Sequence, residues 1–311
     1  MRTPIPADRR ERLATLDFGY AAQPHEAATG CNLCGGTRFV VLTHRDRYGY
    51  PAHADACGGC GLVFLNPRMT AAAYARFYDG VYRPLVSAFH GRLIDATTIQ
   101  DEQREYAIER TEFLRRFLET GPAPVARRLL DIGGSTGVVA AHLMREFALE
   151  GTLIDPAPLE VAQARRLGLE TITGLIEDHD FAGRRFDLVI ICQTVDHLLD
   201  IAGTLARVRS LLTERGLLFI DIVDFRAAYL RNWSVEDAVK IDHPYYLTES
   251  TMTAYLRRTG FDVLGTDYTA DHLHVSYVCR PGAADDALPS PDDVATMLRE
   301  VRFVQNAPRP R

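Results

Sequence analysis

The sequence predicts an α/β fold with a mostly parallel sheet, preceded by a cysteine-bearing segment and a helical stretch. From residue 127 onward, short apolar runs alternate with amphipathic helical patterns, which is typical of parallel strands joined by crossover helices. Ahead of them, four cysteines occur as two Cys-x-x-Cys pairs. The alternation therefore predicts the sheet, and the paired cysteines predict a metal-binding segment in front of it.

Composition and charge narrow the class of protein. The 311 residues are enough for one large domain or two modest ones, and 47% hydrophobic with 24% charged residues excludes a disordered or fibrous chain. A net charge of −6 disfavours nucleic acid or an anionic membrane surface as a partner. No run approaches the ~18 apolar residues of a membrane helix, and the N-terminus lacks a signal-peptide core, so we expect a cytoplasmic protein.

The chain divides into four zones. Residues 1–69 hold the paired cysteines, and residues 70–120 show helical spacing of their apolar side chains. A Gly-Pro-Ala-Pro break opens the strand–helix alternation of residues 121–281. Residues 282–311 carry one further helix and a tail.

Within these zones the periodicity predicts individual elements. Strands are predicted at Arg38–Thr43, Leu62–Leu65, Arg127–Ile132, Gly151–Asp155, Glu170–Thr173, Phe186–Ile191, Gly216–Ile222, Asp262–Tyr268 and His272–Cys279. Helices are predicted at Asp8–Leu16, Gly137–Phe147, Leu159–Leu167, Ile201–Leu211, Thr248–Thr259 and Asp292–Phe303.

The paired cysteines have the spacing of a zinc site. A two-residue gap lets both thiolates of a turn reach one ion, and four thiolates complete a tetrahedral Zn²⁺ site with no open position. The glycines that follow each pair permit the left-handed turn that aims N–H groups at sulfur. We therefore predict a structural, non-catalytic zinc held by Cys31, Cys34, Cys57 and Cys60, with His44 and His53 as alternative ligands.

A glycine-rich turn follows the strand predicted to end at Ile132. The run Asp131-Ile-Gly-Gly-Ser-Thr-Gly137 closes a buried strand and opens a helix, and its glycines let a ligand approach bare backbone. Asp155 ends the next strand, where a carboxylate can accept two ribose hydroxyls. A nicotinamide dinucleotide would use the same geometry with a Gly-x-Gly-x-x-Gly run, which this turn lacks. A turn that serves only packing is the other alternative.

In these residues the sequence resembles the Rossmann-like, class I S-adenosylmethionine-dependent methyltransferases. Five motifs fall in order along residues 125–280: the glycine turn, the acidic pair Asp155-Pro156, the run Gly174–Asp178, the fourth-strand motif Phe186–His197, and Arg215-Gly216 at the entry to the fifth strand. The resemblance implies a seven-stranded, mostly parallel sheet whose last strand is antiparallel. The helical residues 70–120 would then cover the cleft or form the contact of a homodimer.

The resemblance also implies the cofactor, S-adenosylmethionine, and its contacts. The implied cofactor-binding residues are Asp131, Gly133, Gly134 and Gly137 at the methionine part, Asp155 at the ribose, Leu175 and Ile176 at the adenine, and Cys192 and Gln193 beneath the sulfonium. The cysteine segment extends the likeness, since Cys57–Arg68 and Tyr78–Arg83 are similar to bacterial sugar and natural-product methyltransferases with an N-terminal zinc-binding segment.

Histidines supply the candidate base. A hydroxyl acceptor benefits from a general base near its proton, and a pKa near 6.5 suits histidine to that role. His243 opens a His-Pro-Tyr-Tyr run, in a loop that the family often uses to line the acceptor pocket, and His197 follows the fourth strand beside Asp196. We predict these two histidines and Tyr246 as the catalytic residues. Each has a structural alternative, as a helix cap, a turn residue or a core aromatic.

The expected function is methyl transfer to a small molecule, at a hydroxyl of a sugar or natural product. Arg68 and Arg83 would hold an anionic group of that acceptor, or else are solvated charges. One alternative is an RNA methyltransferase that uses the zinc segment to bind RNA, favoured only by a short basic cluster at residues 38–47. The other is a non-catalytic module that binds the cofactor without turnover.

Overall fold

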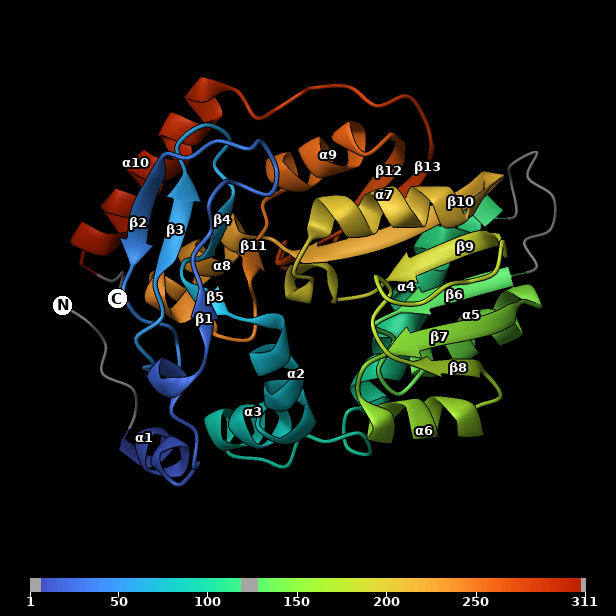
Figure 1. The fold of residues 1–311 in the computed structure, drawn as a ribbon, viewed down its shortest axis with the longest axis horizontal. Helices are drawn as coiled ribbons and strands as arrows, with labels where there is room; N and C mark the ends of the chain where they lie inside the picture. Colours follow the sequence, from blue (N-terminus) through green and yellow to red (C-terminus); the bar gives the residue numbers. More distant parts are fainter. Residues whose placement is uncertain (1–6, 119–127, 309–311) are drawn as a thin grey trace.

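A seven-stranded sheet is the largest sheet of the computed structural model, which describes residues 7–118 and 128–308 (Figure 1). The strand order is β12-β13-β10-β9-β6-β7-β8, and β13 runs antiparallel to both of its neighbours. The other neighbouring strands pair in parallel. This arrangement confirms the predicted fold class, including the antiparallel last strand.

The strands of this sheet are the apolar runs of the sequence. They are β6 (Arg128–Ile132), β7 (Glu150–Asp155), β8 (Glu170–Thr173), β9 (Phe186–Ile191), β10 (Leu212–Val223), β12 (Phe261–Tyr268) and β13 (His274–Pro281). Near-continuous burial, as in β9 and the second half of β10, is expected when helices cover both faces of a parallel sheet.

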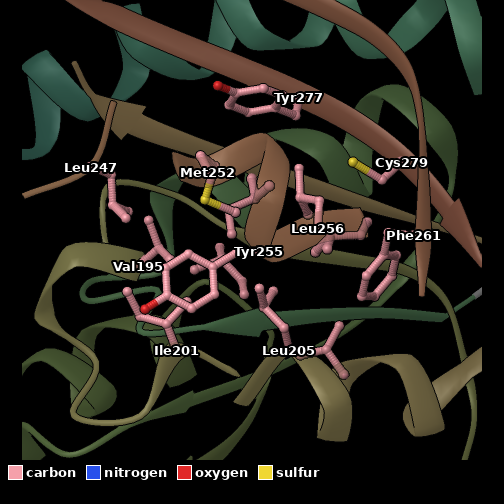
Figure 2. Packing of buried hydrophobic residues seen from close by; sticks show 14 of the residues in the cluster. Val195, Ile201, Leu205, Leu247, Met252, Tyr255, Leu256, Phe261, Tyr277 and Cys279 are labelled. Carbon is pink, nitrogen blue, oxygen red and sulfur yellow. The ribbon is translucent and has the colours of Figure 1, made fainter. Parts of the chain in front are cut away.

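A different set of helices covers each face of the sheet. One face packs against α4 (Gln100–Leu118), α5 (Val138–Phe147) and α6 (Pro158–Arg166), which share a buried apolar cluster. The other face packs against α7 (Ile201–Leu211) and α9 (Glu249–Arg258). Figure 2 shows Met252, Tyr255 and Leu256 of α9 inserted between the start of α7 and the side chains of β12 and β13.

The N-terminal cysteines lie in a second, four-stranded antiparallel sheet. Its order is β11-β4-β3-β2, with β2 at Phe39–Thr43, β3 at Ala54–Cys57, β4 at Val63–Leu65 and β11 at Tyr245–Tyr246. Residues far apart in the sequence therefore share one sheet, because Tyr245 pairs with Phe64 and Tyr246 with Val63. Through β11, the zone of residues 121–281 contributes one strand to the sheet of the cysteine segment.

Further helices surround this second sheet (Figure 1). Side chains of α10 (Pro291–Asn306) join the buried cluster of the second sheet, together with side chains from residues 71–90 and 225–232. The remaining elements are α1 (Ala7–Ala14), α2 (Ala71–Gly80), α3 (Tyr82–His90), α8 (Phe225–Asn232), the short strands β1 (His25–Glu26) and β5 (Arg68–Met69), and the 3-10 turns Tyr20–Ala22, Val195–His197 and Glu236–Ala238.

The predicted elements agree with these bounds to within a few residues. The sequence pattern missed the strands β1, β3, β5 and β11 and the helix α8, which are short or lack a clear period. The predicted break at residues 121–124 lies outside the described residues. The division into four zones stays a prediction. No helix within residues 7–118 and 128–308 is long and apolar enough to cross a membrane.

Candidate cofactor site, histidine pair and cysteine cluster

The glycine turn after β6 is built so that larger residues cannot replace its glycines. Gly133 and Gly137 adopt positive φ of 67° and 74°. A Cβ atom on Gly134 would lie 2.2 Å from a carboxylate oxygen of Asp131, and one on Gly137 would lie 2.7 Å from the Cβ of Ala164. The turn therefore needs glycine for helix packing as well as for an open backbone.

Asp155 ends β7 beside this turn, as predicted. One carboxylate oxygen accepts a hydrogen bond from the Ser135 N–H at 2.9 Å and the other from the Ala157 N–H at 2.8 Å. Burial is the main cause that raises the pKa of Asp155 to about 6. Each oxygen keeps a lone pair, so this fixed carboxylate could still accept two hydroxyl donors.

The carboxylate of Asp131, near the end of β6, lacks a hydrogen-bond partner within residues 7–118 and 128–308. Its carboxylate is fully buried, and neither oxygen has a hydrogen-bond partner among the described residues. Burial, followed by the charge of Asp155, raises the pKa of Asp131 to about 8. A ligand with a cationic group would satisfy this carboxylate, because a buried unpaired acid is costly. The site therefore fits the ammonium-bearing methionine part of S-adenosylmethionine.

The other predicted cofactor residues are distributed around the same edge. Leu175 is 43% exposed, whereas Ile176 is buried among the core side chains. Gln193 follows β9 with a positive φ of 49°, and its N–H donates to Asp221 Oδ1 at 2.6 Å. The predicted roles of Leu175, Ile176, Cys192 and Gln193 stay predictions, but the strands bring the last two to the same end of the sheet as the glycine turn.

The two predicted histidines lie together. The ring centroids of His197 and His243 are 4.3 Å apart; His243, Asp196 and Asp242 are buried, and the His197 side chain is 20% exposed. The two elements that carry them are far apart in the sequence but meet where the loop after β9 contacts the loop before β11. Thr194 ties this cluster to the glycine turn, since its hydroxyl donates to Gly133 O at 3.2 Å.

His243 lies between two carboxylates. Its Nδ1 is 2.6 Å from Asp196 Oδ2, and its Nε2 is 3.3 Å from Asp242 Oδ2. Burial alone would lower the pKa of His243, but the two carboxylates outweigh it and raise the pKa. The pKa values of both carboxyl groups lie well below their usual range, because the histidine charge opposes their burial. His243 Nε2 also lies 3.3 Å from Lys240 Nζ, so charged neighbours engage both ring nitrogens, an arrangement that does not suit a base.

His197 has the opposite electrostatics. Burial and the positive charge of His243 lower its pKa to about 4, so the ring is neutral at pH 7. Tyr78 Oη lies 2.7 Å from His197 Nδ1 and donates to Asp242 O at 2.8 Å. We assign the ring proton to Nδ1, which also lies 3.1 Å from Asp242 O, because this leaves the Tyr78 proton on the same carbonyl. His197 Nε2 is left as a basic nitrogen, 4.0 Å from Asp196 Oδ1.

Two of the side chains expected near the acceptor have internal roles. The hydroxyl of Tyr246 donates to Lys240 O at 2.6 Å and accepts from Lys240 N at 3.0 Å, within the core. Arg68 donates to Leu199 O at 2.8 Å and pairs with Glu26 at 3.0 Å. Both hydrogen-bonding positions of the Tyr246 hydroxyl are filled, so the geometry favours its structural alternative.

Arg83 contacts the edge of the glycine turn from α3. Its Nη2 lies 2.6 Å from Glu160 Oε1, and the other oxygen of Glu160 is bonded to the Ser135 hydroxyl. Gln103, near the start of α4, is bonded to the Thr136 hydroxyl. The helical zone thus touches the predicted cofactor turn at two points, as a cover over this edge would.

The sequence did not single out Tyr78, Asp242 or Lys240 as site residues. Tyr78 and Tyr82 recur four residues apart beside the histidines, and this repeat was the available signal. Asp242 is next to His243 in the chain, but only the fold shows that it faces the imidazole.

The four predicted zinc ligands converge. The Sγ atoms of Cys31 and Cys60 are 3.5 Å apart, as are those of Cys34 and Cys57, and all four lie within 4.8 Å of one another. Sulfur atoms bound at about 2.3 Å around a tetrahedral Zn²⁺ would be about 3.8 Å apart. The N–H groups of Gly36 and Gly59 each donate to a cysteine sulfur at 3.4 Å. Gly35 and Gly61 adopt the predicted left-handed conformation.

Comparison with known families agrees with this geometry. Residues 100–266 match the family described as "Methyltransferase domain". The chain belongs to this methyltransferase family. With the sheet order above, these residues form a class I, S-adenosylmethionine-dependent methyltransferase domain.

Among curated relatives, a ubiquinone biosynthesis O-methyltransferase of Methylocella silvestris is 33% identical over 98 residues, which cover 30% of this chain and 38% of the relative. Another, of Azorhizobium caulinodans, is 25% identical over 152 residues, covering 44% and 59%. This methyltransferase chain thus spans less than two thirds of these relatives. A solved S-adenosylmethionine-dependent methyltransferase of Clostridium acetobutylicum has a TM-score of 0.47 at 15% identity, covering 68% of this chain and 99% of that one.

The histidine electrostatics predict two different titrations. In the folded protein, the pKa of His243 should lie above 6.5 and that of His197 near 4. His243 then stabilises the fold below pH 6.5, and this contribution is lost as the pH rises through its folded pKa. For His197 the sign is reversed: stability is lost as the pH falls below 6.5, because only the unfolded chain takes up the proton. NMR titration of the ring nitrogens, assigned with His197→Gln, measures both. Two ordinary titrations near pH 6.5 would contradict this assignment.

Proposed function

We propose that this methyltransferase transfers a methyl group from S-adenosylmethionine to a hydroxyl of a small-molecule acceptor, such as a sugar or natural product, with His197 as general base. The observation that carries the proposal is the neutral His197 ring, oriented by Tyr78 and tied through Thr194 to the glycine turn. The names of the curated relatives specify O-methylation, which supports an oxygen acceptor.

The cofactor would be held by this chain's own groups at the edge of the sheet. Asp131 would pair with its ammonium group, Asp155 would accept its ribose hydroxyls, and the glycine turn would leave room for its methionine part. When bound, S-adenosylmethionine supplies an electrophilic methyl group on a sulfonium. Methyl transfer then depends chiefly on aligning the acceptor oxygen with that carbon.

His197 and its neighbours would each have a different role in removing the acceptor proton. His197 Nε2 takes the proton of the hydroxyl, while the Nδ1 proton stays fixed toward Tyr78 and the Asp242 carbonyl. His243 stays charged between its carboxylates, and its positive charge keeps His197 unprotonated in the resting site. Asp196 lies close enough to His197 to stabilise the imidazolium that forms.

Cofactor binding tests the first part of the proposal. Asp155→Ala should weaken S-adenosylhomocysteine binding by about tenfold to a hundredfold, since hydrogen bonds to a charged group contribute about 1.5–3 kcal/mol each. Calorimetric titration measures this loss, and Asp286→Ala, an exposed acid in the segment after β13, is the matched control with unchanged affinity. If the unmodified protein did not bind S-adenosylhomocysteine, the methyltransferase proposal would fail.

Removal of the base tests the second part. His197→Gln should lower methyl transfer by about 10²- to 10⁴-fold, because the acceptor proton loses its acceptor, while S-adenosylhomocysteine affinity changes little. Turnover is measured as S-adenosylhomocysteine release in a screen of hydroxyl acceptors, with the exposed His90→Gln as control. Equal rates in His197→Gln and the unmodified protein would overturn the base. Cofactor binding without turnover on any acceptor would favour a non-catalytic module.

We further propose that the four cysteines bind one structural Zn²⁺. Four sulfur ligands in near-tetrahedral proximity, each pair with an N–H donor, fit a closed zinc site with no position for a substrate. The ion would hold the turn of Cys31 and Cys34 against the second cysteine pair. That pair begins at Cys57, the last residue of β3, and β4 follows it.

The zinc proposal predicts a measurable metal and a loss of stability without it. Elemental analysis should find about one zinc per chain, and Cys34→Ser should lose most of it and lower the thermal midpoint, because structural zinc in zinc fingers contributes about 10–16 kcal/mol. Cys279→Ala, at a buried lone cysteine, should keep its zinc. Protein purified without chelator that holds no zinc would contradict the proposal.

A further inference from the structure

We propose that Arg110 binds a carboxylate group of the methyl acceptor, in a cavity between α4 and the β12–β13 hairpin. The inference rests on the proposed function and deepens it by naming a substrate class, an acceptor that carries a carboxylate as well as a hydroxyl.

The cavity lies at the functional edge of the sheet. It has a volume of about 570 Å³ and is lined by Glu109 and Arg110 of α4 and by residues 267–271 and His274 of the hairpin. His274 is the register partner of Val223 at the carboxyl end of β10. The cavity therefore opens at the same end of the sheet as the glycine turn and Gln193, where a ligand of an α/β sheet binds.

Arg110 is a buried charge whose nearest carboxylates are not close. Its side chain is 4% exposed, and its Nε has no hydrogen-bond partner among the described residues. Asp221 Oδ2 is 3.9 Å from Nε, and Glu109 Oε2 is 3.6 Å from Nη1. The guanidinium stacks over the ring of Tyr106, 4.8 Å from its centroid. Both ion-pair distances exceed that of a hydrogen bond, so the guanidinium keeps donor capacity for an anionic oxygen in the cavity that it lines.

Asp221 forms a loose, buried ion pair with this arginine and connects it to the loop after β9. Its Oδ2 accepts the Tyr106 hydroxyl at 2.7 Å, and its Oδ1 accepts the Gln193 N–H at 2.6 Å. Asp221 is therefore used in holding the loop after β9, the loop expected beneath the sulfonium. An acceptor anchored on Arg110 would lie one side chain away from that loop.

The surrounding charges select a singly charged anion. Glu109 and Asp267 stand at the cavity, and Asp271 is paired with Arg231. Burial lowers the pKa of His274, so that side chain offers a neutral hydrogen bond and no second positive charge. One guanidinium facing several acids favours a monoanion over a phosphate dianion. A planar carboxylate also matches the fork of an arginine.

Binding of matched probes to the protein saturated with S-adenosylhomocysteine tests the inference. Benzoate should bind at least about tenfold more tightly than its neutral isostere benzamide, and more tightly than phenyl phosphate. Arg110→Gln should abolish the preference for benzoate, and Arg110→Lys should keep part of it. Arg104→Gln, which removes an exposed arginine from the same helix, should leave the preference unchanged. Thermal unfolding confirms that each variant is folded.

The possible failures are distinguishable. Equal binding of benzoate and benzamide by the unmodified protein, or tighter binding of phenyl phosphate, would overturn the inference while cofactor binding stands. Loss of S-adenosylhomocysteine affinity in Arg110→Gln would also overturn it, because the anion held by Arg110 would then be the carboxylate of the cofactor. Absence of S-adenosylhomocysteine binding in the unmodified protein would instead overturn the proposed function.

Discussion

The amide of Asn32 is the contact through which the cysteine cluster fixes the rest of the site. Asn32 lies between Cys31 and Cys34 and donates to Asp200 Oδ1 at 2.8 Å, while its Oδ1 accepts from the Ala202 N–H and the Tyr255 hydroxyl. Asp200 in turn caps α7. The turn that holds two of the four sulfurs is thereby bonded to the start of α7 and to α9. A rigid turn at this point limits the positions open to the loop that precedes α7.

That loop carries Asp196 and His197, and it is held by further contacts from the N-terminal segment and from β11. Arg68 and the Tyr245 hydroxyl both donate to Leu199 O, and the Tyr78 hydroxyl contacts the ring of His197. His243 reaches the same place because β11 pairs with β4 beside the cysteines. The histidine pair therefore depends on both halves of the molecule. The two rings differ in pKa because His243 lies between carboxylates, which raise its pKa, whereas burial and the charge of His243 lower the pKa of His197.

Much of the fold and part of the site follow from sequence patterns. The period of β6 to β10, the glycine turn and the cysteine spacing are local signals, so they predict the sheet, the cofactor edge and the four sulfurs. The charge of His243 is not local, because it depends on Asp196 being brought to its Nδ1. Likewise, the sequence around Tyr246 fits a core aromatic and a substrate contact equally well. Only the two hydrogen bonds between its hydroxyl and the Lys240 backbone show that it has a core role. The sequence did not indicate Arg110 as a site residue, because its burial depends on the β12–β13 hairpin.

Hydrogen exchange in Asn32→Ala tests most directly whether the cysteine turn holds the loop that carries Asp196 and His197. The variant keeps all four cysteines and removes about three hydrogen bonds, each contributing about 1 kcal/mol. Amides from residue 195 to residue 205 should exchange at least about tenfold faster, whereas those of β6 and β7 stay unchanged, as all should in the exposed Asn306→Ala control. Unchanged exchange in residues 195–205 of Asn32→Ala would contradict the account.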